Sequence, residues 1–175
     1  MNQTPERICS FIHVDDDAHD LYLVRYAAKR TGLPFKLEQF DSAHRFLSYL
    51  AFPDAFAPSR KFSQPAFLLL DYHLKGTIAP EVIPRVRALA VGRSLPIIIY
   101  SSSGDIGNVM RASQAGANHF LTKSADLSRL RLILASLYSG VLTGNDFSLL
   151  AELREYRPMR SGSPASPSLA AVHTR

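Results

Sequence analysis

Residues 8–17 read ICSFIHVDDD, a largely apolar run followed at once by Asp15, Asp16 and Asp17. The run is too short for a typical helix, and it contains the β-branched and aromatic residues that strands favour. A strand that is apolar on both faces is typical of a parallel sheet covered by helices. This stretch therefore predicts a buried parallel strand that ends at a group of carboxylates.

Two further apolar runs have the same character, and both end at polar residues. FLLL at 67–70 ends at Asp71, and PIIIY at 96–100 ends at Ser101. Weaker strand candidates lie at 35–40 and 118–122, and the second of them ends before Lys123.

Amphipathic segments with helical spacing separate these runs. They lie at about 17–31, 41–50, 80–90, 103–115 and 126–139. Strand and helix thus alternate five times. This alternation predicts an α/β fold, a doubly wound five-stranded parallel sheet with helices on both faces.

The chain has 175 residues, of which 46% are hydrophobic and 20% are charged, and its formal net charge is +5. This balance is typical of a soluble globular domain with a short extension. The lone Cys9 excludes a disulfide framework and a cysteine-based zinc site, and without a block of Lys and Arg we expect no DNA partner. No apolar run approaches the roughly 18–20 residues that span a bilayer, and the N-terminus lacks a secretory pattern. We therefore expect no membrane partner and a cytoplasmic location.

Composition divides the chain into a core domain and flanking segments. We expect an N-terminal arm at 1–7, the domain at 8–139, a short helical extension at 140–157 and a disordered Ser- and Pro-rich tail at 158–175. The segment 52–65 has three prolines and no hydrophobic period, which predicts a surface insertion.

The residues that follow the strands carry the candidate chemistry, because ligands of doubly wound sheets bind beyond the carboxyl ends of the strands. Clustered carboxylates need a cation, or one of them takes up a proton. Hard oxygen ligands suit Mg²⁺, which can also offset the charge of a transferring phosphoryl group. Asp71 is then placed to be a nucleophile, and Lys123 can pair with Asp71 or with a phosphoryl oxygen.

Each residue of this set also has an ordinary structural interpretation. Aspartates and serines before helices are frequent N-caps, and a single lysine is most often solvated. The chemical interpretation is favoured because four separate strand ends each carry the required residue type.

Four motifs resemble the receiver domains of two-component response regulators. They are VDDD at 14–17, LLD at 69–71, PIIIYS at 96–101 and GANHFLTK at 116–123. The resemblance implies a (βα)5 receiver fold of the flavodoxin-like type over 8–139. It implies a phosphoacceptor switch with self-catalysed phosphoryl transfer and dephosphorylation, and not an enzyme with multiple turnover.

The resemblance also implies roles for individual residues. Asp71 would accept phosphate from a histidine kinase, and Lys123 would correspond to the lysine of the family's active site. Mg²⁺ would be bound by Asp16, by Asp71 and by the backbone carbonyl of His73, with Asp15 acting through water. Ser101 and Phe120 would be the switch residues.

A narrower resemblance concerns residues 123–130, KSADLSRL, and the long loop before Asp71. Both are similar to single-domain regulators paired with bacterial phytochromes. This implies a phytochrome-type kinase as partner and a homodimer through the face of the last helix and strand. With about 35 residues after the last predicted helix, we expect no DNA-binding output domain and a downstream protein target.

The chain departs from the family's usual pattern at three places. Ser124 follows Lys123 where many receivers have a proline in a cis peptide, and the usual proline after Asp71 is absent. Ser102 replaces the small Ala or Gly often found after the switch residue. Our hypothesis is that Ser102 narrows the access of water to the phosphoryl group and lengthens its lifetime.

Two other functions remain open. A pseudo-receiver would keep the fold as a binding module without phosphorylation. A phosphatase of the haloacid-dehalogenase type would also use an aspartate nucleophile, but that group places it at the end of the first strand with a second Asp two residues later. Here Asp71 ends the third predicted strand, and His73 stands two residues on.

Overall fold

The computed structural model describes residues 8–52 and 64–143. Five parallel strands form its main sheet, in the spatial order β2-β1-β3-β6-β7. They are β1 (Cys9–Val14), β2 (Phe35–Phe40), β3 (Phe67–Leu70), β6 (Ile97–Ser101) and β7 (His119–Thr122). The order reverses beside β1, so the sheet is doubly wound, and the predicted fold class is confirmed.

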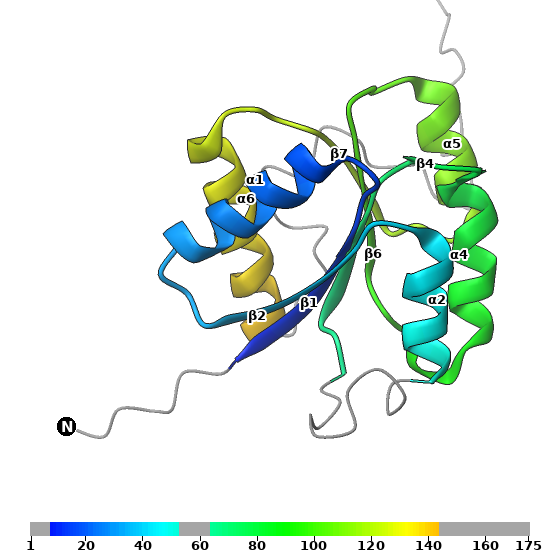
Figure 1. Ribbon diagram of the computed structural model, residues 1–175, viewed down its shortest axis with the longest axis horizontal. Coiled ribbons are helices and arrows are strands. Elements are labelled where there is room, and N and C mark those ends of the chain that lie inside the picture. Colours follow the sequence, from blue (N-terminus) through cyan, green and yellow to red (C-terminus); the bar gives the residue numbers. More distant parts are fainter. Residues whose placement is uncertain (1–7, 53–63, 144–175) are drawn as a thin grey trace, which may run out of the picture.

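Helices cover both faces of this sheet, as Figure 1 shows. α1 (Ala18–Arg30) and α6 (Leu127–Thr143) lie together on one face. α2 (Ala43–Ala51), α4 (Ala79–Ala88) and α5 (Ile106–Ala115) lie on the other, and the 3-10 turn η1 (Ala90–Gly92) follows α4. α6 extends beyond the predicted end at 139. The rest of the predicted extension and tail, the N-terminal arm and most of the 52–65 insertion lie outside the described residues.

The central strands are buried on both faces, because each separates two apolar layers. Ile97, Ile98 and Ile99 are all fully buried. In β1, Ile12 packs in the layer under α2, α4 and α5, whereas its neighbour Phe11 packs in the layer under α1 and α6. Burying one such side chain contributes about 1.5–3 kcal/mol, so the continuous apolar runs stabilise the sheet that positions the polar strand ends.

Caps fix where the helices begin at the carboxyl edge of the sheet. The Asp17 carboxylate accepts a hydrogen bond from the His19 N–H at 2.7 Å, and Asp105 accepts one from the Asn108 N–H at 3.0 Å. α5 ends at Gly116, whose φ of +108° lies in the region that favours glycine. The structural interpretation of an acid after β1 therefore holds for Asp17, which caps α1.

A small antiparallel ribbon follows Asp71 directly. Its strands are β4 (His73–Leu74) and β5 (Thr77–Ile78), and Gly76 makes the turn between them with a φ of +77°. The sequence analysis did not predict this ribbon. It places His73 at the same edge of the sheet as Asp71.

Arg87 of α4 holds the opposite edge of the sheet, where the amino ends of β6 and β7 lie. One guanidinium nitrogen donates to the backbone carbonyls of Gly92 and Leu95 at 2.7 and 2.6 Å. The other donates to the Gly116 carbonyl at 2.7 Å and to the Asn118 side chain at 3.0 Å. The segments before β6 and β7 are thereby joined to α4.

Among the helices of residues 8–52 and 64–143, none has both the length and the apolar character needed to cross a bilayer.

Candidate functional site

Three aspartates meet at the carboxyl edge of the sheet. Oxygen atoms of Asp15, Asp16 and Asp71 all lie within 4.8 Å of one another. They come together because β1 and β3 are adjacent and in parallel register, with Val14 beside Leu70. The N–H of Asp71 donates to the Val14 carbonyl at 2.9 Å, which continues this pairing one residue past β3. The structure thus brings the first and third strand ends together at one point.

Lys123 lies among these carboxylates. Its Nζ is 2.8 Å from Asp15 Oδ2 and 3.1 Å from Asp71 Oδ1. The backbone holds the lysine in place, because its N–H donates to the Ser101 carbonyl at 2.7 Å. Lys123 is therefore a partly buried ion-pair partner and not the solvated lysine of the ordinary interpretation.

The sequence analysis missed a fourth acid, Asp20. Its Oδ2 lies 2.8 Å from the Nζ of Lys123, and its side chain is 23% exposed. Asp20 stands one helical turn before the buried Val24 on α1, so it belongs to the buried face of that helix. An acid within the apolar stripe of a helix is the signal that could have identified it.

The ammonium group of a lysine has three N–H donors, and here three carboxylates surround it. Burial acts to lower the pKa of Lys123, but hydrogen bonds to Asp15 and Asp20 and the attraction of the carboxylates raise it overall. Burial likewise acts to raise the pKa of Asp15, but the neighbouring His13 and Lys123 side chains lower it overall.

Asp71 behaves differently from Asp15. Burial raises the pKa of Asp71 to about 6, although the nearby Lys123 cation acts in the opposite direction. The negative charge of Asp15 acts in the same direction as burial. Burial therefore outweighs the attraction of Lys123 at Asp71, unlike at Asp15.

The donor set fits a hard divalent cation. Asp16 and Asp71 provide carboxylate oxygens that a Mg²⁺ ion prefers, and a magnesium site typically uses one or two carboxylates with several waters. The raised pKa of Asp71 is what a carboxylate in need of a further cation would have. His73, whose carbonyl is the third expected ligand, is exposed in β4, two residues from Asp71.

Ser101 and Ser102 follow one another at the end of β6 but differ in environment. Ser101 is buried, and its Oγ accepts a weak hydrogen bond from the Ser103 N–H at 3.4 Å. Ser102 is exposed. Ser101 is paired with Thr122 of β7, the residue before Lys123, so the expected switch hydroxyl belongs to the same edge as the lysine.

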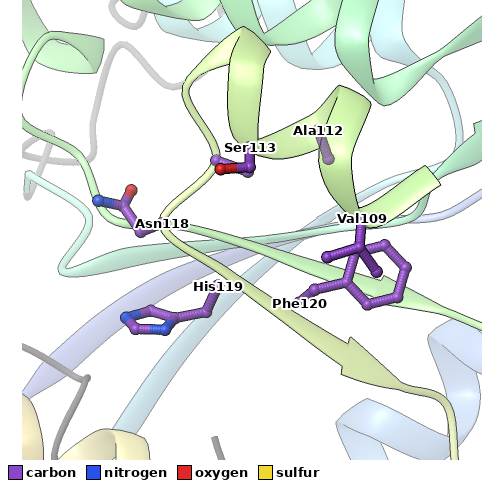
Figure 2. A pocket seen from close by; sticks show the side chains of 7 residues that line it. Val109, Ala112, Ser113, Asn118, His119 and Phe120 are labelled. Carbon is purple, nitrogen blue, oxygen red and sulfur yellow. The ribbon is translucent and has the colours of Figure 1, made fainter. Parts of the chain in front are cut away.

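Phe120 lies in β7, in the apolar layer under α4 and α5. Its ring centroid is 6.4 Å from that of Tyr72, the residue after Asp71. A small apolar pocket lies between β7 and α5, and Figure 2 shows Phe120 and Val109 beside one another in its wall. Phe120, the aromatic residue expected to switch, therefore lies next to Tyr72 and to the apolar pocket.

The peptide bond between Lys123 and Ser124 is trans. Because residue 124 is not proline, it has a backbone N–H, which donates to the Tyr100 hydroxyl at 3.2 Å. Tyr100 is 3% exposed. The departure from the family's pattern at this position thus supplies a hydrogen bond to a buried hydroxyl group.

Comparison with known proteins gives a consistent result. The family model of the response regulator receiver domain matches residues 11–135. The two-component response regulator ARR5 of Arabidopsis thaliana is 31% identical over 130 residues, which cover 71% of this chain and 70% of that protein.

Solved structures with the same fold include two response regulators of phytochromes. The phosphorylated cyanobacterial phytochrome response regulator RcpA has a TM-score of 0.66 and 21% identity, over 79% of this chain and 96% of that one. The bacteriophytochrome response regulator RtBRR has a TM-score of 0.61 and 27% identity, over 75% and 78% of the two chains.

Proposed function

The chain belongs to the response regulator receiver family of two-component signalling, and on this premise we propose that it is a switch in which Asp71 accepts a phosphoryl group from a histidine kinase. The observation that carries the proposal is the meeting of Asp15, Asp16 and Asp71 within 4.8 Å, with Lys123 Nζ 3.1 Å from Asp71. Such an arrangement has a nucleophile, a place for a cation and a fixed positive charge.

In the proposed reaction an Asp71 carboxylate oxygen attacks phosphorus. The new bond joins this oxygen to phosphorus, and the bond that breaks joins phosphorus to the imidazole nitrogen of the kinase, which leaves with the bonding electron pair. Lys123 is placed to pair with a phosphoryl oxygen, because one of its N–H groups already faces Asp71. Protein groups hold the reacting atoms and stabilise charge, and no multiple turnover of a substrate is required.

Mg²⁺ held by Asp16, Asp71 and the His73 carbonyl, with Asp15 acting through water, would offset the charge of the phosphoryl oxygens. Within the protein, Asp15 and Asp20 keep the lysine at the site through their 2.8 Å contacts. The proposal therefore assigns Asp20 to Lys123, Asp15 both to Lys123 and to the water shell of the ion, and Asp71 to the phosphoryl group.

The proposed switch passes from Ser101 to Phe120. Phosphorylation adds charge and acceptor oxygens, and the Ser101 hydroxyl moves to donate to one of them. Phe120 repacks, which alters the surface around α5 and β7 where the apolar pocket lies. We propose that the output is a protein contact with this surface and involves no DNA. Ser102 is proposed to slow hydrolysis by restricting water.

We further propose that the kinase is a phytochrome and that the exchange takes place in the cytoplasm. Support for a phytochrome partner comes from the likeness to RtBRR, a bacteriophytochrome response regulator. The receiver domain is proposed to span 8–139. A homodimer through the face of the last helix and strand remains a prediction.

The test is phosphorylation by acetyl phosphate with MgCl₂, followed by intact-mass spectrometry. We expect one phosphoryl group on the unaltered protein and none on Asp71→Asn. Asp41→Asn is the matched control, because Asp41 also follows a strand at this end of the sheet but is exposed and pairs with Arg45 of α2. Size-exclusion chromatography of both forms tests the homodimer.

Labelling that persists in Asp71→Asn would contradict the assignment of the phosphoacceptor. Absence of labelling, both with acetyl phosphate and with a phosphorylated histidine kinase, would favour the pseudo-receiver. Release of product from a small phosphate ester over many turnovers would favour the phosphatase.

A further inference from the structure

A histidine lies inside the sheet next to the site. His13 belongs to β1, is fully buried, and stands two residues before Asp15. Alternate residues of a strand point to the same face, so both side chains lie on the α1 side of the sheet. Burial lowers the pKa of His13, although the Asp15 carboxylate acts to raise it. A neutral imidazole has one N–H donor and one acceptor nitrogen.

Gln39 of β2 determines which nitrogen of His13 is the acceptor. The amide nitrogen of Gln39 donates to the Leu21 carbonyl of α1 at 2.7 Å. A carbonyl oxygen can only accept, so this bond fixes the orientation of the amide. The same amide nitrogen lies 3.3 Å from the Nδ1 of His13. Nδ1 is therefore the acceptor, and the proton of the neutral ring is on Nε2.

This N–H faces Asp15. The Nε2 of His13 is 3.5 Å from Asp15 Oδ2, and both side chains are fully buried. Within the part of the chain that the structure describes, Nε2 is buried without a hydrogen-bond partner, so it approaches Asp15 Oδ2 at 3.5 Å without forming a hydrogen bond. The separation is longer than the usual N–H···O distance of about 2.7–3.2 Å, but Asp15 provides the oxygen that the N–H faces.

Both carboxylate oxygens of Asp15 therefore have polar neighbours. Oδ1 accepts from the Asp17 N–H at 3.0 Å, and Oδ2 lies 2.8 Å from Lys123 Nζ on one side and faces His13 on another. A series of polar contacts thus joins the Leu21 carbonyl to Gln39, Gln39 to His13, and His13 to Asp15. It connects the start of α1 and the edge strand β2 to the cluster of acids.

We propose that His13 is a positioning residue of this site: Gln39 holds it in the Nε2-protonated tautomer, and its N–H sets the orientation of the Asp15 carboxylate that helps hold the divalent cation and Lys123. The inference rests on the proposed function, since it assigns Asp15 to a magnesium site. Residues that orient metal-binding carboxylates typically change metal affinity by about 10–100-fold when they are removed.

The experiment measures the tautomer and the magnesium affinity of the full chain separately. The ¹⁵N spectrum of histidine-labelled protein identifies which nitrogen of His13 carries the proton, and we expect Nε2. Calorimetric titration with MgCl₂ is expected to give about tenfold weaker binding for His13→Leu. For His13→Gln, whose amide can donate from the position of Nε2, we expect binding within about twofold of the unaltered protein.

His44→Leu is the matched control, because His44 is exposed on α2 and its loss should leave magnesium binding unchanged. If His13→Leu does not fold, Gln39→Met serves in its place. Gln39 is only partly buried, and its replacement removes the donor to Nδ1. We expect both tautomers of His13 to appear in Gln39→Met, together with weaker magnesium binding.

The inference is overturned by an Nδ1-protonated ring in the unaltered protein. Unchanged magnesium affinity in His13→Leu, or in Gln39→Met where the first variant does not fold, overturns it as well. Neither measurement uses phosphorylation. Failure of Asp71 to take up phosphate, or of the unaltered protein to bind Mg²⁺, counts instead against the proposed function.

Discussion

Lys123 and Arg87 are long, partly buried cationic side chains at opposite ends of the strands of the same sheet, and oxygen atoms surround both of them. Around Lys123 the oxygens belong to three carboxylates, at 2.8, 2.8 and 3.1 Å. Around Arg87 they are neutral, three backbone carbonyls and the side chain of Asn118. Burial acts to lower the pKa of both cations. At Lys123 the carboxylates outweigh it and raise the pKa, whereas at Arg87 burial leaves the pKa lowered.

The difference separates the proposed functional edge, at the carboxyl ends of the strands, from a structural edge at their amino ends. Arg87 has a full set of neutral acceptors and needs no further ligand. The acids around Lys123 exceed the charge of one ammonium group, and burial, helped by the charge of Asp15, raises the pKa of Asp71. A further cation at the carboxyl end would offset the negative charge of these acids, whereas the Arg87 contacts need none.

The largest effect is expected from removing the cation of the functional edge. Lys123→Met leaves buried carboxylates without their partner, which costs about 3 kcal/mol or more in the metal-free free energy of unfolding. It should also lower the rate of phosphorylation by acetyl phosphate about 100-fold, since a fixed charge at the phosphoryl group is lost. Urea unfolding and intact-mass spectrometry measure the two effects. Lys75→Met, an exposed lysine beside the same edge, is the control, and equal rates in the two variants would contradict the role of Lys123.

Removing the cation of the structural edge should affect stability alone. Arg87→Leu leaves three partly buried backbone carbonyls without this donor, whereas Asn118 keeps the Ile97 N–H, so the free energy of unfolding should fall by about 3 kcal/mol. Phosphorylation of Asp71 should be unchanged at temperatures where the variant is folded. Arg85→Leu, exposed on the same helix, is the control. If both arginine variants unfold at the same urea concentration, the Arg87 contacts do not hold this edge.

Asp71→Asn should stabilise the metal-free protein. The pKa of Asp71 is about 6 in the folded chain, compared with 3.8 for the ordinary carboxyl group, so ionised Asp71 disfavours the folded state. The gain should be about 3 kcal/mol above pH 6, and it should shrink to nothing as the pH falls from 6 through 3.8, because protonated Asp71 then has no cost.

Urea unfolding in EDTA across this pH range measures the difference between the two proteins. Magnesium should reverse the order, since only the unaltered protein gains from the ion. A variant that is less stable than the unaltered protein in EDTA at neutral pH would mean that Asp71 is already neutralised by Lys123.

The smallest effect is expected from Asp20→Asn. The change removes a negative charge that competes with the phosphoryl group for Lys123. A partly exposed ion pair is worth about 0.2–1 kcal/mol, so we expect the phosphorylated form to last about threefold longer, measured as the loss of phosphoryl mass after removal of acetyl phosphate. Asp17→Asn is the control, because Asn also caps helices well. Faster loss in Asp20→Asn would mean that Asp20 protects the phosphoryl group.

The same contrast explains how much of the site the sequence could predict. Asp15, Asp16, Asp71, Ser101 and Lys123 were predicted to share an edge because each directly follows a strand, and the structure places all of them there. Asp20 and His13 were missed because they lie within a helix and a strand, where only the register decides which way a side chain faces. Their signal was a polar residue in an apolar stripe.

Arg87 and the β4–β5 ribbon were missed for other reasons. On an amphipathic helix an arginine is expected to face solvent, and its acceptors come from segments 5 to 31 residues away in sequence. Strands of two residues have too few positions for an alternation to be detected. The fold follows from local patterns, whereas these contacts depend on how distant segments are brought together.

The trans Lys123–Ser124 peptide has a practical consequence. A proline at residue 124 would carry no exchangeable hydrogen, but Ser124 has one, and it is bonded to the hydroxyl of a buried tyrosine. Deuterium uptake at this single amide should therefore be slow while the segment beside the lysine is closed and should quicken whenever that segment opens. The exchange rate of the Ser124 amide therefore reports local opening of this segment in the native protein.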